Sequence, residues 1–343
     1  MKRYFLITLC GLLFSFVFGY NSTAFAFGEC GLSCCIGGAA TSGVTLAEHI
    51  GLSLQYEYSH METIRDGSSD ISPDEVINNK WMMGGSYSVP TKMTMQKLSL
   101  VAAFPATKRF QILGIVPYIK NDMDMRMKNT MGMTMNHRMD TVDGIGDITV
   151  MGLYTAYTDA PVRPTKRLTL GAGLKTPTGK NNERTSTGSL IHAMMQPGTG
   201  SWDPLFLVNY MRAYYPLILQ ANMFYHLTTE GDEGYEVGDQ LSLDLIARYQ
   251  AANYVNIGFE LNGIHSAEDE DHDGKFSKPA TSMVDNTDNT GLDSIFLTPG
   301  VQIKIPGTGG SADLKYQVPV YQKVNGIQQV TDWKVLTSVT WNF

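Results

Sequence analysis

The chain has 343 residues, of which 17% are charged, and its formal net charge at pH 7 is −7. With so few basic residues it offers no positive surface for a phosphate backbone, so we expect no nucleic-acid partner. Glycine occurs 34 times and tyrosine 17 times. Few charges combined with many glycines and tyrosines fit the class of membrane-embedded β-barrels.

Residues 1–26 have the three parts of a secretory signal peptide. Lys2 and Arg3 form a basic start, residues 5–18 are almost entirely apolar, and residues 24–26 (AFA) give the small-x-small pattern of a cleavage site. The apolar run is shorter than the roughly 18 residues that a membrane-spanning helix needs. We therefore expect cleavage rather than anchoring, and the mature chain then begins at residue 27.

Residues 27–43 form a Gly-rich N-terminal arm that contains Cys30, Cys34 and Cys35. Three cysteines cannot all pair within one chain in an oxidising compartment. One interpretation is a single disulfide that joins Cys30 to Cys34 or to Cys35. The alternative is a thiolate site for a metal or cofactor, and the sequence leaves both open.

From about residue 44, apolar and polar residues alternate in segments about ten residues long. Leu52, Leu54 and Tyr56, for example, interleave with Ser53 and Gln55. A period of two is typical of β-strands that have one apolar face. Twelve strands are predicted, at about residues 47–60, 92–104, 110–123, 145–158, 167–178, 202–213, 216–229, 240–250, 254–266, 292–305, 313–322 and 333–343.

The predicted connections are alternately short and long. Residues 105–108 and 214–215 are short turns, whereas residues 61–91 and 124–144 are long and polar. This alternation is typical of outer-membrane barrels, which have short periplasmic turns and long extracellular loops. We therefore predict an all-β fold over residues 44–343: a transmembrane, antiparallel, up-and-down barrel. An even number of strands places both termini in the periplasm.

The last predicted strand ends in two aromatic residues, Trp341 and Phe343, spaced two positions apart. This ending resembles the C-terminal signal that the barrel-insertion machinery reads during assembly. Together with the signal peptide, it predicts a protein of the bacterial outer membrane. Its partners are then lipid, lipopolysaccharide and, during assembly, the insertion machinery.

Charged residues of both signs fall on the polar faces of the predicted strands, which would line the barrel lumen. The charges could pair across a filled interior, or they could set the selectivity of an open channel. The lumen-facing candidates are Asp147, Lys175, Asp244, Arg248, Glu260, Lys304, Lys315 and Lys334.

Three short motifs stand at predicted strand ends: residues 144–147 (GIGD), 174–179 (LKTPTG) and 198–203 (GTGSWD). With them, roughly residues 90–343 resemble the outer-membrane transporter family named for the "MetA-pathway of phenol degradation", whose barrels are distantly similar to FadL-type importers of hydrophobic compounds. The resemblance implies passive movement of a small solute across the outer membrane. It implies no catalytic residues, and we expect no enzyme.

The segment 121–140 is unusually rich in methionine. Its methionines alternate with other residues, so each group of three shares one face, and a break around Asn129 is compatible with a hairpin. Thioethers are soft ligands that suit Cu(I), with histidine as a companion; alternatively, methionine is a flexible apolar filler. The candidate ligands are Met123, Met125, Met127, Met131, Met133, Met135, His137 and Met139.

Asp269, Asp271 and Asp273 occupy alternate positions before Gly274, as carboxylates do in calcium loops. The twelfth position of such a loop holds Ala280 instead of glutamate, so the complete motif is absent. The segment is then a solvated acidic loop, or one that binds Ca²⁺ weakly.

From the sequence we predict a porin-like channel or transporter that moves small solutes passively. No cofactor is expected apart from the candidate Cu(I) and Ca²⁺ sites. Two alternatives stay open: a barrel that binds or transports copper through the Met-rich loop, and a structural or adhesive barrel with a plugged lumen.

Overall fold

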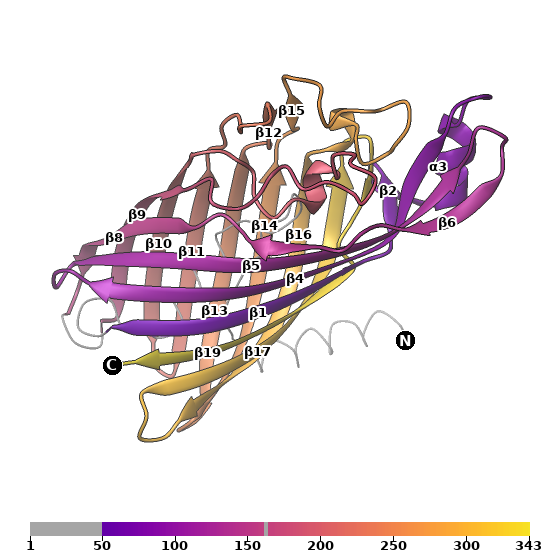
Figure 1. Ribbon diagram of the computed structural model, residues 1–343. Coiled ribbons are helices and arrows are strands. Elements are labelled where there is room, and N and C mark those ends of the chain that lie inside the picture. The colour runs from indigo at the N-terminus through magenta and orange to yellow at the C-terminus, as the bar shows by residue number, and fades with distance from the viewer. Residues whose placement is uncertain (1–49, 161–163) are drawn as a thin grey trace, which may run out of the picture.

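The computed structural model describes residues 50–160 and 164–343, so the predicted signal peptide and the cysteine-bearing arm lie outside the described residues. Twelve antiparallel strands form a closed barrel (Figure 1). The first strand closes it by pairing with both the last strand and the next long strand. The barrel strands are β1 (Gly51–Met61), β4 (Tyr87–Pro105), β5 (Phe110–Lys128), β8 (Thr149–Thr158), β9 (Lys166–Lys175), β10 (Asp203–Tyr214), β11 (Leu217–His226), β13 (Gln240–Ala252), β14 (Val255–Ser266), β16 (Leu292–Ile305), β17 (Gly310–Val324) and β19 (Trp333–Asn342).

All twelve predicted strands are present, and the predicted fold class is confirmed. The largest difference is at β4 and β5, which are 19 residues long and extend well beyond the predicted strand ends. β4 contains Pro90, which donates no ladder hydrogen bond. It is accommodated next to a register shift between Pro90 and Lys92, where the pairing of β4 with β5 is irregular.

Short turns and long connections lie at opposite ends of the barrel, here named the turn end and the loop end. Residues 106–109 and the pair Tyr215–Pro216 are at the turn end. Among the described residues, the loop end carries ten small elements, five of which are labelled at the top and right of Figure 1. They are β2 (Ile64–Asp66), β3 (Ser69–Ile71), α3 (Pro73–Lys80), β6 (Thr134–Arg138), β7 (Val142–Ile145), η1 (Ala193–Met195), β12 (Tyr235–Glu236), β15 (Glu270–Asp271), η2 (Thr287–Asn289) and β18 (Ile327–Gln329).

The two faces of the barrel wall differ in polarity. Leu54 and Leu243 point outward and are about half exposed, whereas Ser53, Gln55 and Ser242 on the inner face are buried. An outward apolar surface on a closed barrel is the lipid-facing surface of an outer-membrane protein, and the protein is therefore placed in the bacterial outer membrane. Among the described residues, no helix is both long and apolar enough to span a membrane.

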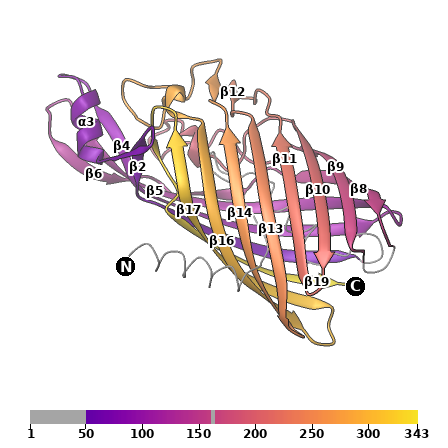
Figure 2. The same ribbon diagram turned by 180° about the vertical axis from the view of Figure 1, so that it is seen from behind.

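The barrel wall is not equally tall all round. Strands β13, β14, β16 and β17, here the full wall, have 12 to 15 residues each and run side by side in Figure 2. Strands β8 and β9, here the short wall, have 10 residues each. β8 pairs with β5 only over Phe110–Ile115, and the rest of β5 pairs with β7 and β6. Residues 176–202 follow the end of β9 and contact this side, for example where the Met195 carbonyl accepts a hydrogen bond from Asn121 of β5.

Candidate functional site in the barrel interior and mouth

The inner face of the full wall carries a network of paired polar side chains. Lys315 of β17 and Glu260 of β14 form an ion pair of 2.8 Å, and both are almost fully buried. The lysine reaches across β16 beside Gly300, where an ideal Cβ would lie only 2.8 Å from its Cγ. A glycine in the intervening strand therefore makes room for the pair. Asn262 donates to Asp244 at 2.9 Å and accepts from Gln317 at 3.1 Å, which continues the network.

Seven of the eight lumen-facing candidates are buried inside the barrel. Lys334 lies 3.7 Å from Glu57 of β1, so this pair spans the strands where the barrel closes. Lys304 differs because it is exposed near the turn-end limit of β16. The buried set is Asp147, Lys175, Asp244, Arg248, Glu260, Lys315 and Lys334. Each of these buried charged side chains lies next to a side chain of opposite charge or next to an amide side chain.

The three sequence motifs meet at one point on the short wall, here named the motif junction. Lys175, the last residue of β9, forms ion pairs with Asp147 at 3.3 Å and with Asp203 at 2.5 Å. Asp147 also accepts hydrogen bonds from the backbone N–H groups of Gly179 and Thr199, both at 2.9 Å. Each motif thus contributes a charge or a backbone donor, because β8 and β10 begin, and β9 ends, at this level.

Close backbone approach explains the glycines of the motif junction. An ideal Cβ on Gly198 would lie 2.6 Å from Asp147 Oδ1 and from the backbone of Gly179. Only glycine permits two chain segments to approach so closely. Sequence reasoning identified these glycines only as strand ends. It placed His226 in the lumen but did not predict its contact with Asp203, whose Oδ2 lies 2.9 Å from His226 Nε2. Both features depend on contacts between segments that are distant in the sequence.

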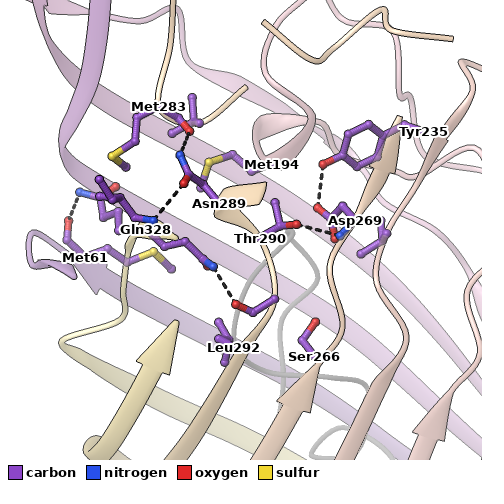
Figure 3. A pocket seen from close by; sticks show the side chains of 15 residues that line it. Met61, Met194, Tyr235, Ser266, Asp269, Met283, Asn289, Thr290, Leu292 and Gln328 are labelled. Atoms are coloured by element: carbon purple, nitrogen blue, oxygen red, sulfur yellow. Dashed lines mark hydrogen bonds between the residues drawn. The ribbon is translucent and has the colours of Figure 1, made fainter. Parts of the chain in front are cut away.

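A pocket opens at the loop end, where three methionines, Met61, Met194 and Met283, border it together with Leu292 (Figure 3). Its volume is about 80 Å³. Polar groups hold the surrounding loops in place: Gln329 donates to the Met61 carbonyl at 3.2 Å, and further hydrogen bonds come from Asn289 and Gln328. The pocket therefore combines apolar thioether walls with a framework of amide side chains.

Asp269 lies at the same pocket and is buried. It accepts hydrogen bonds from the Tyr235 hydroxyl at 2.7 Å and from the Gly238 N–H at 2.8 Å. Burial raises the pKa of Asp269 from its ordinary value of 3.8 to about 6. The pKa of the Tyr235 hydroxyl is raised well above its usual value. Burial is the larger cause, and the charge of the nearby Asp269 carboxylate adds to it. Burial therefore holds the pKa of this loop-end carboxyl group above its ordinary value, although two donors stabilise its ionised form.

The three carboxylates of the predicted acidic loop have separate partners. Asp271 accepts from the N–H of Phe276 at 2.9 Å, and Asp273 pairs with Lys275 at 2.9 Å, while Asp269 points to Tyr235. Within residues 50–160 and 164–343, no three His, Cys, Asp or Glu side chains form a group that could hold a metal ion. The loop is therefore built from local hydrogen bonds and ion pairs.

The Met-rich segment folds as a hairpin of β5 and β6, closed by Asn129, whose side chain accepts from the N–H groups of Met131 and Met133. Met123 and Met125 are buried inside the barrel. The candidates Met127 and Met139 are partly buried, and Met131, Met133, Met135 and His137 are exposed. The buried methionines contact Met61, Met93, Met95 and Met195. Met93 and Met95 alternate on one strand face, a pattern in the sequence that could have identified these partners.

The C-terminal aromatic residues lie at the turn end. Trp341 pairs with Leu52 of β1 and with Gly310 of β17. The Phe343 N–H donates to the Ile50 carbonyl at 2.9 Å, and the side chain of Phe343 is 72% exposed. The terminal ring is therefore accessible on the folded barrel.

A closed barrel with an apolar outer surface and a buried polar interior defines the class of this protein as an outer-membrane β-barrel. Within that class, residues 84–320 match the family described as "Putative MetA-pathway of phenol degradation", and the chain belongs to this family. No curated protein matches the chain in sequence.

Solved structures of outer-membrane proteins are similar in fold. An outer-membrane channel from Pseudomonas putida F1 has a TM-score of 0.56 and 11% identity, covering 87% of this chain and 96% of the other. A FadL homologue from Pseudomonas aeruginosa has a TM-score of 0.45 and 11% identity, with 95% and 99% covered. The toluene transporter TodX from Pseudomonas putida has a TM-score of 0.45 and 8% identity, with 95% and 96% covered. The first of these likenesses establishes a shared barrel fold.

Proposed function

We propose that the protein is a passive transporter that moves small solutes, hydrophobic or aromatic compounds among them, across the outer membrane. In this proposal the loop end faces the cell exterior, both termini face the periplasm, and the solute enters through the pocket of Figure 3. The observation that carries the proposal is that this pocket combines an apolar lining with a few convergent polar groups. That composition is typical of sites for small organic molecules.

The size of the pocket indicates how a solute would be admitted. Its volume of about 80 Å³ is smaller than the ~150 Å³ apolar cavity that accepts benzene in an engineered protein. A ring-sized solute therefore needs the lining to move. Three of the lining side chains are methionines, whose three rotatable bonds allow them to adapt to irregular shapes. Family membership, with its link to phenol degradation, supports aromatic compounds as candidates.

Uptake of labelled phenol and toluene by intact cells tests the proposal, because lipopolysaccharide slows entry of such compounds when no transporter is present. Expression of the protein should raise uptake several-fold. Met194→Trp should abolish most of the gain by filling the pocket, whereas Met83→Trp, at an exposed loop-end position, should not. Equal uptake by cells with and without the protein, at verified outer-membrane levels, would refute the proposal.

The pairing of buried charges in the interior favours one alternative, a barrel whose lumen is closed and whose role is structural or adhesive. Conductance of the purified protein in planar lipid bilayers distinguishes the two functions. A transporter should show openings that phenol modulates. A closed barrel should show neither conductance nor solute uptake.

A further inference from the structure

Four methionines form a continuous row on the inner face at the loop end. Met61 of β1 is directly opposite Met93 of β4, and Met93 is directly opposite Met123 of β5. Met139 continues the row, since its N–H donates to the Met123 carbonyl at 2.9 Å. Side chains opposite one another in antiparallel strands have Cβ atoms about 4.5–5.5 Å apart. The row, here named the methionine row, therefore brings four thioethers together across four chain segments.

The surroundings of the methionine row differ from those of an ordinary apolar core. Of the eight buried residues in this cluster, six are methionine. The larger cluster deeper in the barrel has nine buried residues, of which one, Met151, is methionine and the rest are aliphatic residues and one phenylalanine. Apolar filling elsewhere inside this barrel is thus achieved with a single methionine among nine residues. A requirement for packing alone does not account for its concentration at the loop end.

A second set of soft ligands connects the methionine row to solvent. In the β5–β6 hairpin, Met125 is opposite His137 and Met127 is opposite Met135. Beyond these pairs, Met131 at the hairpin tip is 76% exposed.

At the other end of the row, Met61 and the adjacent Met194 border the pocket of Figure 3. Asn121 donates to the Met195 carbonyl at 3.1 Å and so holds segment 193–195 over the row. Thioether and imidazole groups therefore extend from the exposed hairpin tip to the pocket.

We propose that the methionine row binds a soft monovalent cation, Cu(I) or Ag(I), which the hairpin collects from solvent. Thioethers are neutral, polarisable ligands that favour Cu(I) and Ag(I) over hard cations such as Ca²⁺ and Mg²⁺, which require oxygen ligands. The cation binds and leaves in the same oxidation state, so no electron transfer is involved. The proposal goes beyond solute transport and does not depend on it.

Silver titration tests the proposal by a direct measurement of binding. All four cysteines are first changed to serine, so that thiolates do not bind the metal. Ag(I) is then titrated into the full chain, folded in detergent, by isothermal calorimetry. This cysteine-free protein is the background for the comparison, and we expect it to bind Ag(I) saturably at micromolar protein concentration. The row variant, Met61→Leu with Met93→Leu, Met123→Leu and Met139→Leu, should bind at least tenfold more weakly, because leucine keeps the apolar volume but removes the sulfur.

A matched variant removes four other methionines: Met82→Leu, Met151→Leu, Met211→Leu and Met223→Leu. These residues lie outside both the methionine row and the cluster of buried methionines around it, so this variant should bind Ag(I) like the background. If the row variant does not fold, the single change Met93→Leu at the centre of the row replaces it. X-ray absorption of the bound silver should show sulfur neighbours.

Three outcomes would each overturn the inference: no saturable binding in the background, equal binding by the row variant, or silver that has only oxygen and nitrogen neighbours. Solute uptake by cells is measured without silver. If the methionine row does not bind silver, the transport proposal is unaffected. If the protein does not raise solute uptake, the silver-binding proposal is likewise unaffected.

Discussion

The full wall and the short wall of the barrel stabilise their buried charged side chains in different ways. On the full wall, β14, β16 and β17 pair over most of their length. Inward polar groups there find partners on nearby strands, as Lys315 of β17 reaches across β16 to Glu260 of β14. On the short wall, β8 and β9 stop early, and Lys175 at the end of β9 contacts Asp147 and Asp203 near the adjoining strand ends. The loop of residues 176–202 then supplies the backbone donors that a continuing strand would have supplied.

This difference shows two ways to stabilise a buried charge in the barrel. Strand register can place a partner beside the charge, or a loop can fold back to supply one. Register is set strand by strand, so the partners on the full wall are near neighbours in the sheet. Loop closure requires a distant segment to fold back, as when Thr199 donates to Asp147. The first arrangement should be lost only with the barrel, whereas the second should open locally.

The largest effect is expected from breaking the full-wall ion pair. Lys315→Met leaves Glu260 buried without its charged partner and should lower the free energy of unfolding by about 3–5 kcal/mol. Equilibrium unfolding in lipid vesicles, followed by tryptophan fluorescence, measures this change. Adding Glu260→Gln to Lys315→Met should recover most of the loss. If Lys315→Met alone is neutral, the pair does not stabilise the full wall.

On the outer surface, we expect an arginine substitution to lower the free energy of unfolding equally on the two walls. Leu243 of β13 and Leu170 of β9 are both exposed on the outside, so Leu243→Arg and Leu170→Arg should each cost about 2–4 kcal/mol in a bilayer. Tyr254→Arg, in the exposed turn between β13 and β14, is the control and should cost about 0–1 kcal/mol. The same vesicle unfolding assay applies. A well-tolerated arginine at Leu170 would mean that the short wall does not face lipid at that position.

The smallest effect is expected at the motif junction. Gly198→Ala places a methyl group against Asp147 and the Gly179 backbone, and such overpacking costs about 1–3 kcal/mol. We expect faster hydrogen exchange across residues 176–202 with little change in the rest of the barrel. Gly114→Ala is the matched control, since an added Cβ there has nothing within 4 Å. Uniformly faster exchange over all strands would show that the junction is part of the global folding unit.

Much of the fold follows from local patterns in the sequence. Alternation of apolar and polar residues is a property of a few consecutive positions, so it predicted the number of strands and their inward and outward faces. Leu243 and Ser242 illustrate this, as they point to opposite sides of the wall. The alternation of short and long connections predicted the separation of turns from loops in the same way.

Contacts between distant segments were decided only by the tertiary structure. The sequence gives no distance between Lys175 and Asp203. They meet because Lys175, the last residue of β9, is directly opposite Asp203, the first residue of the antiparallel neighbour β10. Met61 and Met123 belong to one row because β4 lies between their strands with Met93 in register with both. Alternation reports which face a residue occupies. The level at which it meets its neighbours depends on barrel closure and strand register, and these are fixed only when all twelve strands pair.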